Sequence, residues 1–115
     1  MLKEILNKFL ILNGVQAAIV VQENGEIIES MKSGILIDEQ TKNAISILML
    51  DSKDTSIRYE TGPLSLVFVE FSEYFLIIGP LIEEFFLLII AKNTANIGQI
   101  TYEMKKNQQD IVSCL

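Results

Sequence analysis

The chain has 115 residues, half of them hydrophobic, and a formal net charge of −6. This length is typical of one folded domain, and the apolar content excludes a disordered chain. The excess of acidic residues makes nucleic acid an unfavourable partner, because its phosphate groups would be repelled. We therefore expect a single domain over residues 1–115 that does not bind nucleic acid.

The first three predicted elements lie before residue 31. In LKEILNKFLILN, which starts at Leu2, apolar residues recur at the spacing of one helical face, and Gly14 is a suitable stop. The β-branched run VQAAIVVQ and the segment EIIES flank Asn24-Gly25, which is the strongest short signal of a hairpin. The sequence therefore predicts a helix followed by strands at 15–22 and 26–30.

The middle of the chain is expected to hold one helix and one long loop. Asp38 has the character of an N-cap, and the apolar block that follows predicts a helix over 39–51. The polar stretch DSKDTSIRYETGP, residues 51–63, is interpreted as a linker loop with a short extended piece from Ile57 to Tyr59.

Three strands at 64–71, 74–81 and 84–91 follow with very short separations, which permit only antiparallel hairpins. The last of them is apolar on both faces, so helices should cover the sheet on both sides. Capping residues and helical spacing then predict a helix over 95–112. The predicted class is α+β, in the order α-β-β-α-β-β-β-α.

Residues 44–50, AISILML, make the middle helix apolar almost all the way round, with Ser46 as the one polar member. One side can pack on the chain's own sheet, and the simplest cover for the other side is a second copy of the helix in a two-fold dimer. If the apolar strand LSLVFVEF lies at the border of the sheet, its unpaired backbone N–H and C=O groups would also favour association with another strand. The alternative is that both elements are buried within a monomer.

The sequence predicts no catalytic, cofactor-binding or metal site. Glu83 and Glu84 fall in an expected turn between two strands, and the six glycines form no phosphate-binding motif. The chain has no histidine, which excludes a serine–histidine–aspartate triad, and a single cysteine, Cys114, which excludes an internal disulfide. An enzyme is therefore the least favoured class.

No signal for export or membrane insertion is found. The most apolar stretch, residues 74–91, is interrupted by Gly79-Pro80 and by two glutamates, whereas a spanning helix needs about 20 largely uncharged residues. The N-terminal segment carries charges at helical spacing rather than the uncharged run of a signal peptide. We expect a cytoplasmic location.

The order of elements and several local patterns resemble the roadblock domain of the roadblock and dynein light-chain family. The resemblance is carried by GVQAAIVVQENGEIIES for the first hairpin and by FLIIGPLIEEFFLLIIAKNTANIGQI for the last strands and the entry to the final helix. Within the second stretch, Asn96-Ile97-Gly98 falls where the family's helix-opening Asn-Leu-Gly usually lies. The match covers essentially the whole chain.

This resemblance implies a five-stranded antiparallel sheet, profilin-like in layout, with the first and last helices on one face and the middle helix on the other. It implies dimers, with itself or with another roadblock domain, that join through the middle helix and the third strand. The family consists mostly of non-enzymatic platforms, some of which bind small Ras-like GTPases, and others of which are adaptors in larger assemblies. The residues carried over as dimer interface candidates are Ile45, Leu48, Met49, Leu66 and Phe68.

The leading hypothesis is thus a homodimeric scaffold that regulates or tethers a small GTPase, with Glu39, Lys42 and Ser46 as candidate contacts. Two alternatives remain open. One is a small-molecule sensor, which predicts a cavity lined by the sheet. The other is an adaptor that serves as a dimerisation module in a larger complex.

Overall fold

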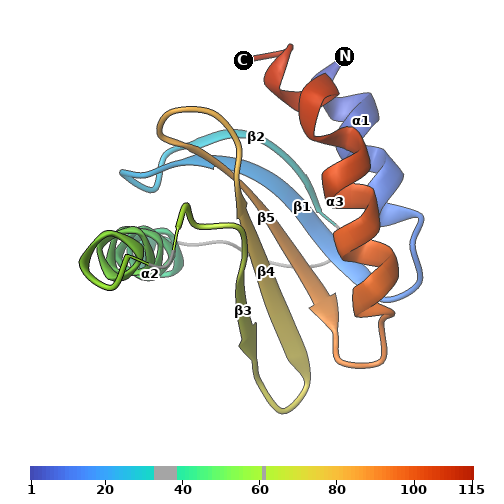
Figure 1. The fold of residues 1–115 in the computed structure, drawn as a ribbon. Helices are drawn as coiled ribbons and strands as arrows, with labels where there is room; N and C mark the ends of the chain where they lie inside the picture. The colour runs from blue at the N-terminus through green and yellow to red at the C-terminus, as the bar shows by residue number, and fades with distance from the viewer. Residues whose placement is uncertain (33–38, 61) are drawn as a thin grey trace.

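The computed structural model describes residues 1–32, 39–60 and 62–115, and it confirms the predicted order of elements (Figure 1). The helices are α1 (Leu2–Leu10), α2 (Glu39–Arg58) and α3 (Ile97–Val112). The strands are β1 (Val15–Gln22), β2 (Ile27–Lys32), β3 (Val67–Glu70), β4 (Tyr74–Pro80) and β5 (Phe85–Lys92).

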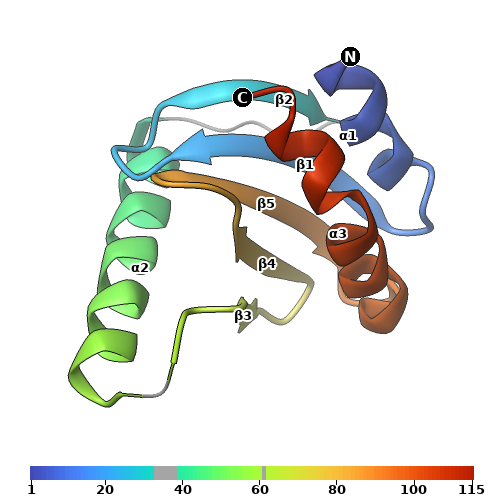
Figure 2. The ribbon, with the colours of Figure 1, turned by 45° about the horizontal axis from the view of Figure 1, so that its top comes forward.

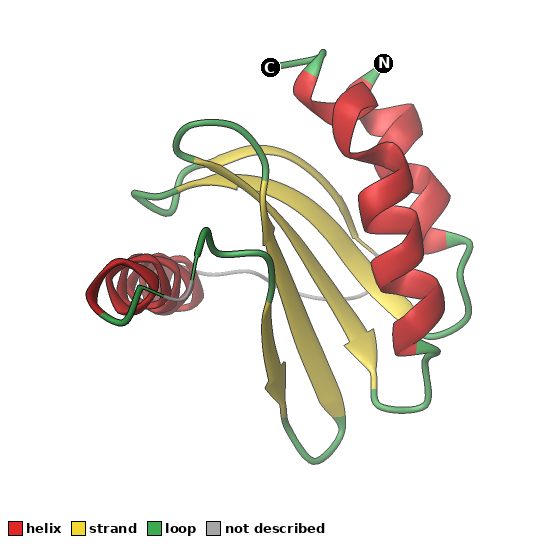
Figure 3. Cartoon of the chain, in the orientation of Figure 1, coloured by secondary structure: helices red, strands yellow, loops and turns green. Residues whose placement is uncertain are grey.

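The five strands form one sheet in the order β2-β1-β5-β4-β3, and each pair of neighbours is antiparallel. β5 lies in the middle, between β1 and β4. β2 and β3 are the two edge strands. The third strand therefore lies at the border of the sheet, which is the position that would leave its backbone groups open. In Figure 3 short loops join β1 to β2, β3 to β4 and β4 to β5, as the short separations in the sequence require.

Helices cover both faces of this sheet. Figures 1 and 2 show α1 and α3 on one face and α2 on the other, as the resemblance implied. Two apolar clusters result, one between the sheet and the α1–α3 pair, the other between the sheet and α2. Alternate residues of β5 supply both clusters: Leu87 and Ile89 point to the first, and Leu88 and Ile90 to the second. A strand that is apolar on both faces is therefore fully covered.

The β1–β2 hairpin and the start of α3 follow the local chemistry of the sequence. Gly25 has a φ of +90°, which is accessible to glycine at little cost. The Asn24 side chain accepts a hydrogen bond from the backbone N–H of Glu26 at 2.9 Å, which closes the turn. Asn96 caps α3, because its side chain accepts a hydrogen bond from the N–H of Gln99 at 3.0 Å.

Two predicted boundaries in the middle of the chain were wrong. α2 continues to Arg58, seven residues beyond its predicted end at 51, so most of the expected linker loop is helical and the extended piece at Ile57 is not present. β3 begins at Val67 instead of 64. The N-cap predicted at Asp38 lies outside the described residues.

Side chains explain the longer helix. The hydroxyl groups of Ser52 and Thr55 donate hydrogen bonds to the carbonyls four residues earlier, each at 2.8 Å, so these residues satisfy their polar groups within the helix. Arg58 pairs with Asp54 at 2.7 Å across one turn. A polar composition here therefore marks a partly solvated helix rather than a loop.

Candidate functional site

α2 is apolar on two opposite sides, and the described residues of the chain cover one of them. On the outer side Ile47 is 60% exposed and Leu50 is 47% exposed. They are three residues apart, so they lie one turn apart on the same side of the helix. Ala44 and Asp51, which extend this side, are exposed as well. We call Ala44, Ile47 and Leu50 the outer stripe.

The inner side of α2 is held against the sheet by Ile45 and Met49, which are 5% and 0% exposed. Both belong to the apolar cluster that includes Ile19 and Leu88 of the sheet, and Leu48 packs against this cluster while partly buried. The three helix residues predicted at a dimer interface therefore lie, within this chain, on the inner side or its flank. The exposed members of the same apolar block are those of the outer stripe.

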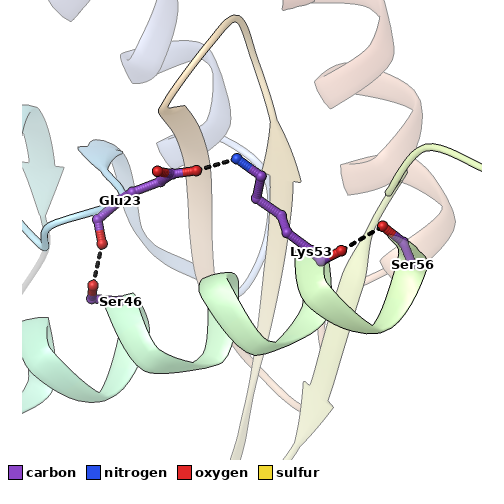
Figure 4. A network of polar contacts seen from close by, with 4 residues as sticks. All are labelled: Glu23, Ser46, Lys53 and Ser56. Carbon is purple, nitrogen blue, oxygen red and sulfur yellow. Dashed lines mark hydrogen bonds and ion pairs between the residues drawn. The ribbon is translucent and has the colours of Figure 1, made fainter. Parts of the chain in front are cut away.

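Polar contacts also attach α2 to the turn between β1 and β2 (Figure 4). The Glu23 carboxylate forms an ion pair with Lys53, and the Glu23 carbonyl accepts a hydrogen bond from the Ser46 hydroxyl. The Lys53 ammonium lies 5.7 Å from the ring centroid of Phe86, within the range of a cation–π contact. Two residues of α2 that lie nearly two helical turns apart therefore contact the same residue of the β1–β2 hairpin loop.

Of the three residues predicted to contact a partner, Glu39 is exposed, and Lys42 and Ser46 are half-buried. Glu39 and Lys42 form an ion pair at 3.0 Å on the first turns of α2, and the Glu39 side chain is largely exposed. Ser46 is half-buried, and its hydroxyl is used by Glu23. A partner that approaches the start of α2 would meet Glu39 before the other two.

β3 presents the second accessible apolar surface. It pairs with β4 alone, so one side of its backbone is open. Phe68, 47% exposed, lies opposite Ile77 and its ring centroid is 5.5 Å from that of Phe75, which places it on the sheet face covered by α1 and α3. Val67 lies opposite Ile78 and packs on the α2 side. The interface candidate Leu66 precedes the strand and is partly exposed.

α2 and β3 are neighbours in space. Ser52, Thr55 and Ser56 of α2 and the segment 62–67 together line a shallow cavity of about 420 Å³. The structure therefore brings the helix and the edge strand to one region, although the predicted candidates from α2 and those from β3 lie on opposite faces of the sheet. Sequence reasoning listed Ile47 and Leu50 as apolar but did not assign them to the surface, since the side that faces the sheet was not known.

Other predicted features can also be placed. Glu83 and Glu84 are exposed in the turn between β4 and β5, as expected. Within residues 1–32, 39–60 and 62–115, no group of three or more acidic or cysteine side chains is placed to hold a metal ion. No helix in the part of the chain that the structure describes is long and apolar enough to cross a membrane.

This arrangement, a five-stranded antiparallel sheet with α2 on one face and α1 and α3 on the other, is that of the roadblock domain, so the resemblance seen in the sequence is confirmed at the level of fold. A Roadblock/LC7 domain from Streptomyces avermitilis has a TM-score of 0.79 and 14% identity, over 96% of this chain and 94% of that one. Myxococcus xanthus MglB has a TM-score of 0.87 and 14% identity, over 98% and 93%.

The likeness extends more weakly to profilin. Schizosaccharomyces pombe profilin has a TM-score of 0.65 and 11% identity, over 98% of this chain and 94% of that one. No protein-family model matches the chain, and no curated protein matches it in sequence. Similarity at these identities describes the fold, and one fold serves many functions.

Proposed function

We propose that the protein is a non-enzymatic scaffold that forms a homodimer through α2 and β3 and binds a small Ras-like GTPase. The observation that carries the dimer is the outer stripe of α2, which is exposed while the opposite side of the same helix is buried. The GTPase rests on the resemblance to roadblock domains, some of which bind such partners. The roadblock fold is consistent with both parts of the proposal.

The free energy of burial favours pairing. Ile47 and Leu50 are each about half exposed or more, and apolar surface removed from water contributes roughly 25 cal/mol per Å². A two-fold axis between residues 47 and 50 of two antiparallel α2 helices would place Ile47 against Leu50 of the partner subunit. Because such an interface is self-complementary, each contact occurs twice.

The open edge of β3 is a second feature that favours pairing with another copy of the chain. Unpaired backbone N–H and C=O groups at a sheet edge are a template for another strand, and soluble proteins usually blunt them with proline, lysine or a bulge. None of these occurs in Val67–Glu70. In the proposed dimer β3 pairs with its symmetry mate, and Leu66 and Phe68 contribute to the contact. Ile45 and Met49 contribute to the dimer indirectly, because they pack α2 against its own sheet.

The dimer is tested by the molar mass in solution. We expect a mass near twice the 13.0 kDa of the chain, and a monomer when Ile47→Glu or Leu50→Glu introduces a charge into the outer stripe. Ile11→Glu is the matched control, because Ile11 is also an exposed isoleucine and follows α1 on the other face. A wild-type monomer, or a dimer that survives both α2 substitutions, would refute the interface.

The GTPase partner is tested by mixing the protein with small GTPases of the same cell, in both nucleotide states. Co-elution and a changed hydrolysis or exchange rate support the proposal. Glu39→Lys, which reverses an exposed charge on the first turn of α2, should weaken the complex but leave the dimer mass unchanged. Absence of binding to every such GTPase in either state would remove this half of the proposal and leave the dimerisation module.

A further inference from the structure

A cavity of about 680 Å³ lies on the sheet face that α1 and α3 cover, between α3 and the segment 63–66 that leads into β3. Its volume is within the range of sites that hold small molecules. It is distinct from the outer stripe of α2, which is on the opposite face, and none of the surfaces used in the proposed dimer contributes to it except Leu66.

The cavity exists because β3 is shorter than its neighbour. β4 continues to Pro80, but the ladder to β3 stops at the pair Val67–Ile78. Pro80 has no N–H to donate, so it cannot extend the ladder in the usual way. The segment before Val67 therefore leaves the sheet and forms a separate wall, and space remains between that wall and α3.

The floor of the cavity is apolar, and a glycine allows its side chains to pack closely on the sheet. Gly79 lies opposite Leu87, and a Cβ at Gly79 would lie 3.1 Å from the Met104 methyl carbon and 3.5 Å from a Leu66 methyl carbon. The absent side chain leaves room where these two residues approach the sheet. Leu87 and Met104 line this floor together with Leu66.

The rim carries a single positive charge. Thr101, Lys105 and Gln108 recur along one side of α3 and border the cavity. The Gln108 amide donates to the Pro80 carbonyl at 3.4 Å, which links α3 to the end of β4 at the border of the cavity. Lys105 is the one charged side chain among the described residues that line the cavity, and no ion pair joins it to any of them. An accessible cation beside an apolar floor favours a ligand that carries a negative charge.

We propose that this cavity binds a single-chain amphiphile with an anionic head group. The hydrocarbon chain lies between α3 and the wall formed by residues 63–66, where Leu66 is 37% exposed, above the buried floor of Gly79, Leu87 and Met104. The head group pairs with the Lys105 ammonium at the rim. Carboxylate and phosphate heads share this chemistry. Neither a neutral nor a cationic head of the same chain length gains the ion pair, so the head group sets the selectivity. This proposal does not depend on dimerisation or on a GTPase.

The test is a titration of isotopically labelled protein with decanoate, below the concentration at which micelles form, followed by NMR. We expect saturable shifts at the amides of Gly79, Thr101 and Gln108, and much weaker binding of decanol and decylammonium. Lys105→Glu should raise the decanoate Kd about tenfold, since an attractive pair is replaced by a repulsive one. Lys106→Glu is the matched control: it makes the same charge change on an exposed neighbour that does not line the cavity, and its Kd should stay within about twofold.

Gly79→Val adds a test of the floor, because its side chain occupies the space next to Met104 and should abolish binding if the fold persists. Lys105 is exposed, so the outcome with Lys105→Glu decides the matter even if Gly79→Val does not fold. Four results would overturn the proposal: no saturable binding of decanoate, shifts confined to Ile47 and Leu50, equal affinity for decanol, or equal losses from the two lysine substitutions. A parallel titration with dodecyl phosphate shows whether the site prefers a phosphate head group or a carboxylate head group.

Discussion

Substitutions at two adjacent residues can distinguish how much each apolar side of α2 contributes to the free energy of unfolding. Met49 is fully buried between the helix and the sheet, so Met49→Ala removes its apolar contacts and leaves a cavity. Truncations of this kind cost about 2–5 kcal/mol. Because the total stability of a small protein is only about 5–15 kcal/mol, the loss should be large. Met49 and Ile45 are the buried residues of α2, so the helix should also lose much of its packing against the sheet.

Leu50→Ala is the matched control, since it is the next residue of the same helix and is already half exposed. Its truncation should cost about 1 kcal/mol or less within one chain, because about half of its surface is already exposed to water. A dimer would add a concentration-dependent contribution to both measurements. The comparison is therefore made in an Ile47→Glu background, in which the proposed interface is disabled.

Urea unfolding followed by circular dichroism gives both free energies, provided that the slope with denaturant is unchanged between variants. The reasoning predicts a loss for Met49→Ala that exceeds the loss for Leu50→Ala by at least about 1 kcal/mol. Equal losses would show that the buried and exposed sides of α2 have been assigned wrongly. A larger loss for Leu50→Ala would mean that the helix packs on the sheet through the outer stripe.

Two further predictions concern local structure. Asn96→Ala should lower the stability by about 1 kcal/mol, because the N–H of Gln99 loses its capping acceptor, and an unchanged unfolding midpoint would contradict that role. Gly25→Ala should cost about 1–3 kcal/mol more than Gly62→Ala in the same unfolding assay. Both glycines have positive φ, but only at Gly25 would a Cβ meet a backbone atom, the Lys42 carbonyl oxygen at 3.0 Å, whereas Gly62 has open space. Equal costs would show that the turn does not press against α2.

The fold could be predicted from local patterns because most elements are signalled by their own residues. Asn24-Gly25 identifies the first hairpin, and the double-sided apolar run of β5 identifies a strand covered on both faces. The end of α2 could not be predicted in this way. Its inner side continues as Ser52, Lys53 and Ser56, which are half-buried polar residues, so the apolar periodicity stops about two turns before the helix does.

The candidate site was only partly predictable for a related reason. The sequence shows that residues 44–50 are apolar around the helix, but it does not show which of them face the sheet. That choice depends on how α2 docks, which is set by long-range contacts such as those of Glu23 with Ser46 and Lys53. A cavity lined by the sheet was predicted only under the alternative of a small-molecule sensor, and its place beside α3 was not predicted, since it depends on where β3 ends relative to β4.

The pairing of β1 with β5 has a consequence for the order in which the molecule folds. Ala18 pairs with Ile89, so the two central strands come from distant parts of the sequence, and neither β4 nor the β1–β2 hairpin can join the sheet until β5 is in place. Contacts of such long range are associated with slow folding. A nascent chain that stops short of residue 85 would hold two separate hairpins with exposed apolar faces, a state prone to aggregation and suited to capture by chaperones.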